Sequence, residues 1–292
     1  MKTKLPPIGT VKKLDGFTNI FALNGFADEL SSLGRKRIYK YVKKNRFIGG
    51  IEKKEFVFVS PEEWKDKYER RFLYTKFDNP KYEQRKMRCA CFTNERYWGE
   101  EAGWKSYGFD TSGKVVRLKI KLESFLKELD TFAAKTRAKI YIGKAMYDFT
   151  VKEINHIHES HSPYYKVFFP ENFRDENYLS LMLLKRKAFS YEKEIRIFIY
   201  YDNVEVSNTK KTLLEKVPVD YKDIISEIHI SPLLDEKEKK KEIQEINKRL
   251  PGVKVNESRL YKSGWELKSV PCDESKKKNK NDSNSSASSK TP

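Results

Sequence analysis

The chain has 292 residues, and its 38% hydrophobic and 13% aromatic residues can build a sizeable core, which excludes a chain that is disordered throughout. Its 60 Lys and Arg against 42 Asp and Glu give a formal net charge of +18, which favours polyanions such as nucleic acid or nucleotides as partners. No stretch approaches the roughly 20 apolar residues of a membrane-spanning helix, and the first thirty residues lack the apolar segment of a secretory signal.

Hydrophobic periodicity and turn residues then predict the elements in chain order. A lead-in segment broken by Pro and Gly ends at the Asn24-Gly25 turn signal. The predicted strands cover residues 37–42, 55–60, 87–93, 115–122, 139–142, 146–151, 191–201, 224–231 and 253–260. The predicted helices cover residues 27–33, a stretch through Phe47 and Ile51, a segment opened by Ser60-Pro61, and residues 122–132, 171–184 and 235–250. This order predicts an α+β fold with mixed, mostly antiparallel twisted sheets flanked by helices.

Composition divides the chain into three parts. Residues 1–35 are the lead-in segment, residues 36–272 form one α+β domain, and the Lys, Ser and Asn-rich residues 273–292 are expected to be a disordered tail. The tail carries a formal charge of about +2, so most of the positive charge belongs to the folded part. The chain has an odd number of cysteines, Cys89, Cys91 and Cys272, whereas a secreted domain usually pairs its cysteines. We therefore expect a protein of the reducing cytoplasm, without a membrane partner.

The segment Tyr191-Glu192-Lys193-Glu194-Ile195-Arg196 is the most informative motif. Strand alternation would put Glu192, Glu194 and Arg196 on one face and three isoleucines on the other. Such charges repel or lose hydration unless they face water, pair with each other or hold a ligand. Two interpretations stay open: an exposed acid-base ladder, or a site carboxylate on a rigid strand with Arg196 fixing it or binding phosphate.

A second group is Tyr39-Lys40-Tyr41, where the two tyrosines share a strand face and Lys40 opposes them. This combination can stack on a flat ring and reach a phosphate, although tyrosine is also common in ordinary strands. Ser60 and Trp64, with Asp66 and Glu69 beyond them, follow a strand end, where ligand-contacting loops often begin.

Other candidates have simpler explanations. Trp98, Trp104 and Tyr107 favour core packing over ligand stacking. His156, His158 and His161 could gather a metal, but no Cys or acidic partner is arranged as a closed site demands, so no metal is predicted. Cys89 and Cys91 share a strand face without a neighbouring His and are expected to act as small buried hydrophobes. The glycine-rich fingerprints of common ATPases and dehydrogenases are absent from the sequence.

Several segments together resemble an uncharacterised bacterial family, domain of unknown function 2971, over residues 36–255. The most specific is Lys185 ahead of the 191–196 motif. The others are Ile38-Tyr39-Lys40-Tyr41, Phe56-Val57-Phe58-Val59-Ser60-Pro61 with Trp64 and Asp66, Cys91-Phe92-Thr93, Trp104-Lys105-Ser106-Tyr107-Gly108 and Glu227-Ile228-His229-Ile230-Ser231-Pro232. The chain departs from the family pattern at residues 65–69 and at Phe189-Ser190.

The order of these segments also looks like that of ADP-ribosyltransferases. The resemblance implies NAD as cofactor, with Lys40 or Tyr41 at the ribose, Ser60 near the nicotinamide, and Glu194 or Glu192 at the ribose hydroxyls. Tyr39, Trp64, Lys185 and Arg196 complete the predicted cofactor-binding set. The first-strand His familiar in that superfamily is absent here. A carboxylate suits this chemistry because breaking the nicotinamide-ribose bond builds positive charge on the sugar.

Two functions therefore remain open, beside a third interpretation as a scaffold for another protein. The first is an NAD-consuming, ADP-ribosyltransferase-like enzyme with Glu194 and Glu192 as catalytic residues, which acts on nucleic acid or an associated protein, in a phage-defence setting. The second is a non-catalytic, basic nucleic-acid-binding protein of phage or bacterial origin, whose basic and aromatic surface grips phosphates and bases.

Overall fold

The computed structural model describes residues 7–31, 36–70, 87–94, 100–108, 114–201, 213–258 and 260. All of them belong to the first of the chain's two units, Met1–Leu260, and the second is Tyr261–Pro292. Trp98, Cys272 and the predicted tail over 273–292 lie outside the described residues. Within the described part, no helix is both long and apolar enough to cross a membrane.

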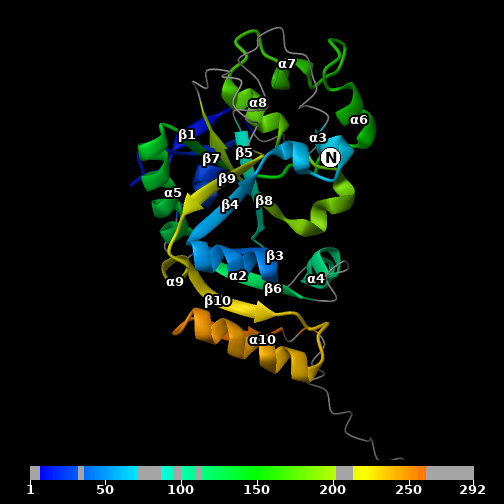
Figure 1. The fold of residues 1–292 in the computed structure, drawn as a ribbon. Helices are drawn as coiled ribbons and strands as arrows, with labels where there is room; N and C mark the ends of the chain where they lie inside the picture. Colours follow the sequence, from blue (N-terminus) through cyan, green and yellow to red (C-terminus); the bar gives the residue numbers. More distant parts are fainter. Residues whose placement is uncertain are drawn as a thin grey trace, which may run out of the picture. The chain divides into compact units, whose positions relative to one another are not determined.

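Eleven strands of the described residues join in one sheet, which helices flank (Figure 1). The strands are β1 (Val11–Lys13), β2 (Ile20–Leu23), β3 (Arg37–Lys43), β4 (Glu55–Val59), β5 (Met87–Thr93), β6 (Val115–Lys121), β7 (Lys139–Lys144), β8 (Glu194–Tyr200), β9 (Leu214–Pro218), β10 (Ile225–Ile230) and β11 (Lys254–Glu257). Their order is β1-β2-β7-β8-β5-β3-β6-β10-β11, and β4 pairs with β5 and β9. Only the β2–β7 and β10–β11 pairs among these are parallel. The predicted mixed, mostly antiparallel α+β class is confirmed.

The sheet branches at β5. One edge of β5 pairs along its whole length with β8, whereas the other edge meets β3 at Thr93 and β4 at Cys89. Between these two pairs the Cys91 carbonyl accepts a hydrogen bond from the Lys40 ammonium at 2.9 Å. A side chain thus satisfies a backbone group at the point where the two strands diverge, as a buried carbonyl requires.

The helices connect and cover these strands. They are α1 (Phe26–Glu29), α2 (Lys44–Lys53), α3 (Lys67–Arg70), α4 (Glu100–Gly108), α5 (Leu122–Thr136), α6 (Val151–His156), α7 (Tyr165–Phe168), α8 (Asp175–Leu181), α9 (Tyr221–Ile224) and α10 (Glu236–Arg249), with the 3-10 helices η2 (Pro61–Glu63) and η6 (Lys187–Glu192). Ser60 caps η2 with Pro61 in its first turn, as predicted. In Figure 1, α10 runs alongside β10.

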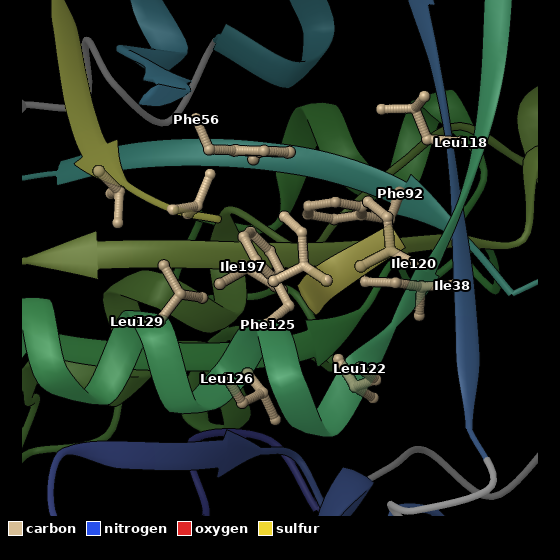
Figure 2. Packing of buried hydrophobic residues seen from close by; sticks show 14 of the residues in the cluster. Ile38, Phe56, Phe92, Leu118, Ile120, Leu122, Phe125, Leu126, Leu129 and Ile197 are labelled. Atoms are coloured by element: carbon tan, nitrogen blue, oxygen red, sulfur yellow. The ribbon is translucent and has the colours of Figure 1, made fainter. Parts of the chain in front are cut away.

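One face of the sheet packs on α5. Figure 2 shows Phe125 of this helix pointing into a group of aromatic and aliphatic side chains from the strands. Its ring lies 4.8 Å from Phe56 and 5.7 Å from Phe92, centroid to centroid. The apolar positions of α5 recur every three or four residues, so a single stripe of the helix faces the sheet. Ile195, Ile197 and Ile199 belong to this core, as their alternation predicted.

The opposite face of β8 is also covered. Phe198 and Tyr200 pack there with α8 and with residues 146–168 in a second core. All seven residues of β8 are therefore buried. This contradicts the interpretation of its charged face as an exposed ladder, because helices cover both faces of the strand.

Three stretches differ from the prediction. Residues 146–151 do not form a strand: Met146 makes an isolated bridge with Leu184, and α6 begins at Val151 behind a Thr150 capping box. β1 and β2 lie within the predicted lead-in segment, and β9 has no counterpart among the predicted strands. Every residue of β1 is exposed, so it has no buried face to give the sequence an apolar alternation.

Candidate functional site

The site is built on the first residues of β8. Glu194 is 5% exposed and Arg196 is fully buried. The Arg196 guanidinium donates from Nε to one Glu194 oxygen at 3.0 Å and from Nη2 to the other at 3.3 Å. Its Nη1 donates to the Met182 carbonyl. Residues two apart on a strand point to the same face, so β8 holds this pair in fixed register.

Lys185 joins two carboxylates beside that pair. Its ammonium donates to Glu194 and, at 2.5 Å, to Glu192. Glu192 was predicted to lie on the strand, but it ends η6, and Lys193 has a left-handed φ of 43° before β8 begins. This turn interrupts the strand alternation, but the Glu192 carboxylate still lies within hydrogen-bonding distance of Lys185. The Glu192 side chain is 34% exposed, which makes it the accessible carboxylate of the group.

A close approach of two backbones places Lys185. Residues 183–185 run beside residue 146, with Met146 N–H donating to the Leu183 carbonyl at 2.7 Å and Lys185 N–H donating to the Met146 carbonyl at 2.9 Å. Gly143 on β7 makes room, because a Cβ there would lie 2.6 Å from the Leu183 side chain. A larger residue at position 143 would require the Leu183 side chain to shift.

Glu69 of α3 completes the network. Its carboxylate accepts from Nη2 of Arg196 and lies 3.4 Å from the Lys185 ammonium. The charge network, defined as Glu69, Lys185, Glu192, Glu194 and Arg196, thus sets three carboxylates against two cations. These five side chains carry a net charge of −1 when all are ionised. Excess charge in a mostly buried cluster is costly unless a counter-charge approaches it.

The two glutamates of the motif differ in pKa. Burial acts to raise the pKa of Glu194, but the positive charges of Arg196 and Lys185 prevail and lower it to about 2. Burial raises the pKa of Glu192 above its usual value, and Lys185 offsets this only in part. The pKa of Lys185 is raised in spite of its burial, because Glu194 and Glu69 favour its charged form. Glu194 is thus ionised at neutral pH, and Glu192 is the easier of the two to protonate.

Aromatic and basic side chains form the rim of the network. Trp64, a predicted site residue, lies with its ring 4.3 Å from the Arg196 guanidinium carbon. Arg186 donates from Nε and Nη2 to one oxygen of Asp66, at 3.1 and 2.9 Å. Its guanidinium carbon also lies 4.6 Å from the Tyr68 ring and 4.8 Å from the Phe189 ring. In both places a guanidinium lies against the face of an aromatic ring.

A row of paired residues connects Glu194 to Tyr39. Glu194 pairs with Thr93 on β5, and Thr93 pairs with Tyr39 on β3. Directly paired residues point to the same face, so Tyr39 shares the face of the charge network. The Tyr39 ring packs against Arg117, whose guanidinium carbon is 4.2 Å away.

Tyr41 lies two residues further along the same face. It packs edge to face on Trp104 at 5.0 Å, and Trp104 is fully buried, so its predicted role in core packing is confirmed. Lys40 points to the opposite face, where its ammonium lies 5.0 Å from the Phe92 ring, and burial lowers its pKa. The structure therefore brings Tyr39, but not Lys40, to the face of Glu194.

The predicted Ser60 is buried at the end of β4. Its hydroxyl accepts from the Glu62 N–H at 3.4 Å and its own N–H donates to the Leu213 carbonyl at 2.7 Å. These contacts give Ser60 a capping role. Its place in a nicotinamide pocket stays a prediction.

Four residues of the site were not predicted, namely Tyr68, Phe189, Tyr147 and Arg186. Tyr147 accepts a 3.0 Å hydrogen bond from the Glu194 N–H, and burial raises its pKa. Arg186 lies directly after Lys185 and was not singled out. The adjacent Lys185-Arg186 pair was the available signal for the arginine, whereas nothing in the local pattern around Tyr147 distinguishes it from other tyrosines.

The histidines and cysteines fall into different surroundings. His156 and His161 both contact Glu159, at 2.7 and 3.0 Å, on an exposed hollow beside α6. Cys89 is buried as expected, and Cys91 contacts Glu194. The contact with Cys89, together with burial, raises the pKa of the Cys91 thiol, which keeps it protonated and poorly nucleophilic.

Comparisons with known proteins do not assign the chain to a family. No family model matches the chain, and no curated protein matches it. The resemblance to domain of unknown function 2971 therefore stays a prediction. Among solved structures, DarT of Thermus sp. 2.9 in complex with NAD+ aligns with 77% of this chain and 96% of that chain, at 9% identity and a TM-score of 0.35. A likeness at this level assigns no activity to the chain.

Proposed function

We propose that the protein is an NAD-consuming, ADP-ribosyltransferase-like enzyme that acts on nucleic acid or on a protein bound to it. The observation that carries the proposal is the net charge of −1 in the charge network. A cluster in which carboxylates outnumber the cations that bind them stabilises a positive charge that develops beside it. The break of a nicotinamide-ribose bond builds such a charge on the sugar.

The residues around the network suit the chemical groups of NAD. Glu192 is the accessible carboxylate and can accept hydrogen bonds from ribose hydroxyls. Lys185 and Arg186 are cations of the kind that bind a diphosphate, and Trp64, Tyr68 and Phe189 offer ring faces. When bound, NAD would supply the glycosidic bond that is broken.

Glu194 and Glu192 have different roles in this proposal. Glu194 has a lowered pKa and is held by Arg196 and Lys185, so it contributes a fixed negative charge. Glu192 shares Lys185 and is 34% exposed, so it meets the sugar directly. Tyr147 positions Glu194 by accepting from its N–H. Preorganised charges of this kind act without reorganisation during the reaction.

Nicotinamide release is the direct test. We expect wild-type protein, supplied with NAD and candidate DNA, RNA or protein acceptors, to release nicotinamide, and Glu192→Gln to reduce the rate at least about 100-fold, the scale of losing one transition-state interaction. Glu227→Gln is the matched control, because Glu227 on β10 also lies among cations, with Lys119 at 3.0 Å, outside the charge network. The proposal fails if wild type and Glu192→Gln are equally inactive with every acceptor.

A thermal-shift titration with NAD separates binding from chemistry. A ligand at a hundred times its dissociation constant stabilises the native state by about 2.7 kcal/mol. We expect wild type to shift upward and the shift to shrink in Glu192→Gln.

The second candidate is non-catalytic nucleic-acid binding. The specific observation in its favour is that Glu194 and Arg196 are buried and bonded to each other, as in a structural ion pair. Combined with the net charge of +18, this predicts phosphate binding whose log affinity falls steeply with log salt. In that case Glu192→Gln changes oligonucleotide affinity little, and a flat salt dependence would remove this candidate.

A further inference from the structure

A segment rich in acidic and aromatic side chains lies against the charge network. It runs from Ser60 through η2 to the end of α3 at Arg70. Four of its side chains contact cations on the rest of the site. Trp64 packs on Arg196, and Asp66 and Tyr68 contact Arg186. Glu69 binds Arg196 and lies beside Lys185. We call this stretch, residues 60–70, the acidic segment.

The cations under the acidic segment come from another part of the chain. Lys185 and Arg186 are consecutive, and Arg196 follows on β8. The Lys185 ammonium lies over the Phe189 ring at 5.4 Å, and the Arg186 guanidinium lies between Phe189 and Tyr68. These contacts hold two of the cations close together at one end of β8.

We propose that Lys185, Arg186 and Arg196 form a binding site for a diphosphate ester, and that Asp66 and Glu69 occupy its two anion positions in the present structure. The proposal rests on the proposed function for the identity of the natural ligand, a dinucleotide. A carboxylate and a phosphate both offer anionic acceptor oxygens to a guanidinium, so one can replace the other.

Charge balance supports the exchange. With the acidic segment in place, four carboxylates (Asp66, Glu69, Glu192, Glu194) face the three cations, and the net charge is −1. Without Asp66 and Glu69 the remaining groups carry +1. A diphosphate with two negative charges restores −1. The ligand would thus keep the excess negative charge beside Glu192, on which the proposed chemistry depends.

The two carboxylates also leave together. Asp66 and Glu69 are three residues apart on one short segment, whereas the cations they neutralise are fixed by β8 and by the backbone pairing of residues 183–185 with Met146. A single movement of the acidic segment would therefore remove one carboxylate from each of the three cations, while Glu194 stays bonded to Lys185 and Arg196. Asp66 is the outer of the two contacts, because its partner Arg186 is 28% exposed and Arg196 is fully buried.

Titration calorimetry with inorganic pyrophosphate, at constant ionic strength, tests the proposal on the full chain. We expect Asp66→Asn with Glu69→Gln to bind pyrophosphate at least about tenfold tighter than wild type, since two competing anions are lost. Adding Arg186→Gln should abolish the gain. Glu227→Gln is again the matched control, because it removes a carboxylate among cations elsewhere and should leave pyrophosphate affinity unchanged.

Circular dichroism and thermal melts establish that each variant is folded. If Glu69→Gln does not fold, Asp66→Asn alone carries the test, and a several-fold tightening is expected because Arg186 is released. A folded variant that binds pyrophosphate no better than wild type overturns the proposal.

Nicotinamide release, measured on the same variants, separates this inference from the proposed function. Tighter pyrophosphate binding without nicotinamide release by any variant upholds the diphosphate site and removes the transferase. Nicotinamide release by wild type, with pyrophosphate affinity unchanged in the folded double variant, removes the role of Asp66 and Glu69 and leaves the transferase.

Discussion

Arg196 holds the carboxylate of Glu194 from the same strand, two residues away, through its Nε and Nη2 atoms. The same guanidinium reaches Glu69 on α3 and the Met182 carbonyl at the end of α8. One buried side chain therefore ties two separate parts of the chain to β8. This makes Arg196 a structural centre as well as part of the candidate site.

We predict that Arg196→Met is strongly destabilising. The substitution leaves Glu194 and Glu69 buried without their partner, and breaking a buried ion pair from one side costs about 3–5 kcal/mol. The measurement is the free energy of unfolding from urea denaturation at pH 7. A cost below about 1 kcal/mol would mean that water reaches these carboxylates.

Gly143→Ala should disturb the site through Leu183. The new Cβ would lie 2.6 Å from the Leu183 side chain and 3.3 Å from Leu23, in a fully packed part of the core. Overpacking of this kind costs about 1–3 kcal/mol. We expect Gly143→Ala to lower the free energy of unfolding and to weaken any NAD-dependent thermal shift.

Gly49→Ala is the matched control for that substitution. Gly49 lies in α2, and nothing lies within 4 Å of a Cβ built on it. Alanine in a helix interior is favoured over glycine by about 0.5–1 kcal/mol, so this variant should be slightly more stable than wild type. Equal effects of the two substitutions would refute the steric explanation.

Asp130→Ala should loosen the N-terminal strands. The Asp130 carboxylate on α5 accepts from the Thr18 N–H at 3.0 Å, and from the N–H and side-chain amide of Asn19 at 2.6 and 3.2 Å. These bonds hold the connection between β1 and β2. Because water can reach these donors, the loss of each hydrogen bond costs about 0.5–1.5 kcal/mol. Hydrogen exchange should become faster in β2, and a uniform change over the whole chain would contradict the local explanation.

The sequence predicted the central strands because they carry an apolar alternation. β5 was predicted with its observed bounds, and β3, β4, β6 and β10 to within about one residue at each end. β1 and β9 could not be found in this way, because they are short strands with few buried residues. Residues 146–151 have a strand-like composition, but the Thr150 capping box starts α6 there.

The candidate site could be predicted only along single elements. Strand alternation placed Glu194 and Arg196 on one face. Lys185 precedes the 191–196 motif closely in the sequence, which indicated that it belongs to the same site. The contacts of Glu69 and Asp66 with residues more than a hundred positions away depend on how η2 and α3 fold back over β8. Local periodicity carries no information on such long-range pairing. For the same reason the sequence did not predict Tyr147, whose partner is a backbone N–H of another segment.

The acid stability of the protein should depend on Glu194 and Glu192 with opposite signs. Glu194 has a pKa of about 2 in the folded protein, below its usual value of 4.5, so its contribution is complete above pH 4.5 and disappears as the pH falls toward 2. A carboxyl with a raised pKa, as in Glu192, favours the folded state at low pH and loses that contribution as the pH rises above 4.5.

Urea denaturation of three proteins between pH 2 and 7 checks these signs. We expect wild type to lose stability as the pH falls from about 4.5 toward 2, with Glu194 accounting for on the order of 3 kcal/mol. Glu194→Gln should be less stable at pH 7 and should have a flatter pH profile in that window. In Glu192→Gln, the free energy of unfolding should rise more steeply with pH above 4.5 than in wild type. The reason is that the variant lacks the Glu192 contribution, which wild type loses as the pH rises. If Glu194→Gln and wild type lose stability in parallel, the carboxylate of Glu194 is not held ionised by Arg196 and Lys185, and its assignment as the fixed anion of the site is wrong.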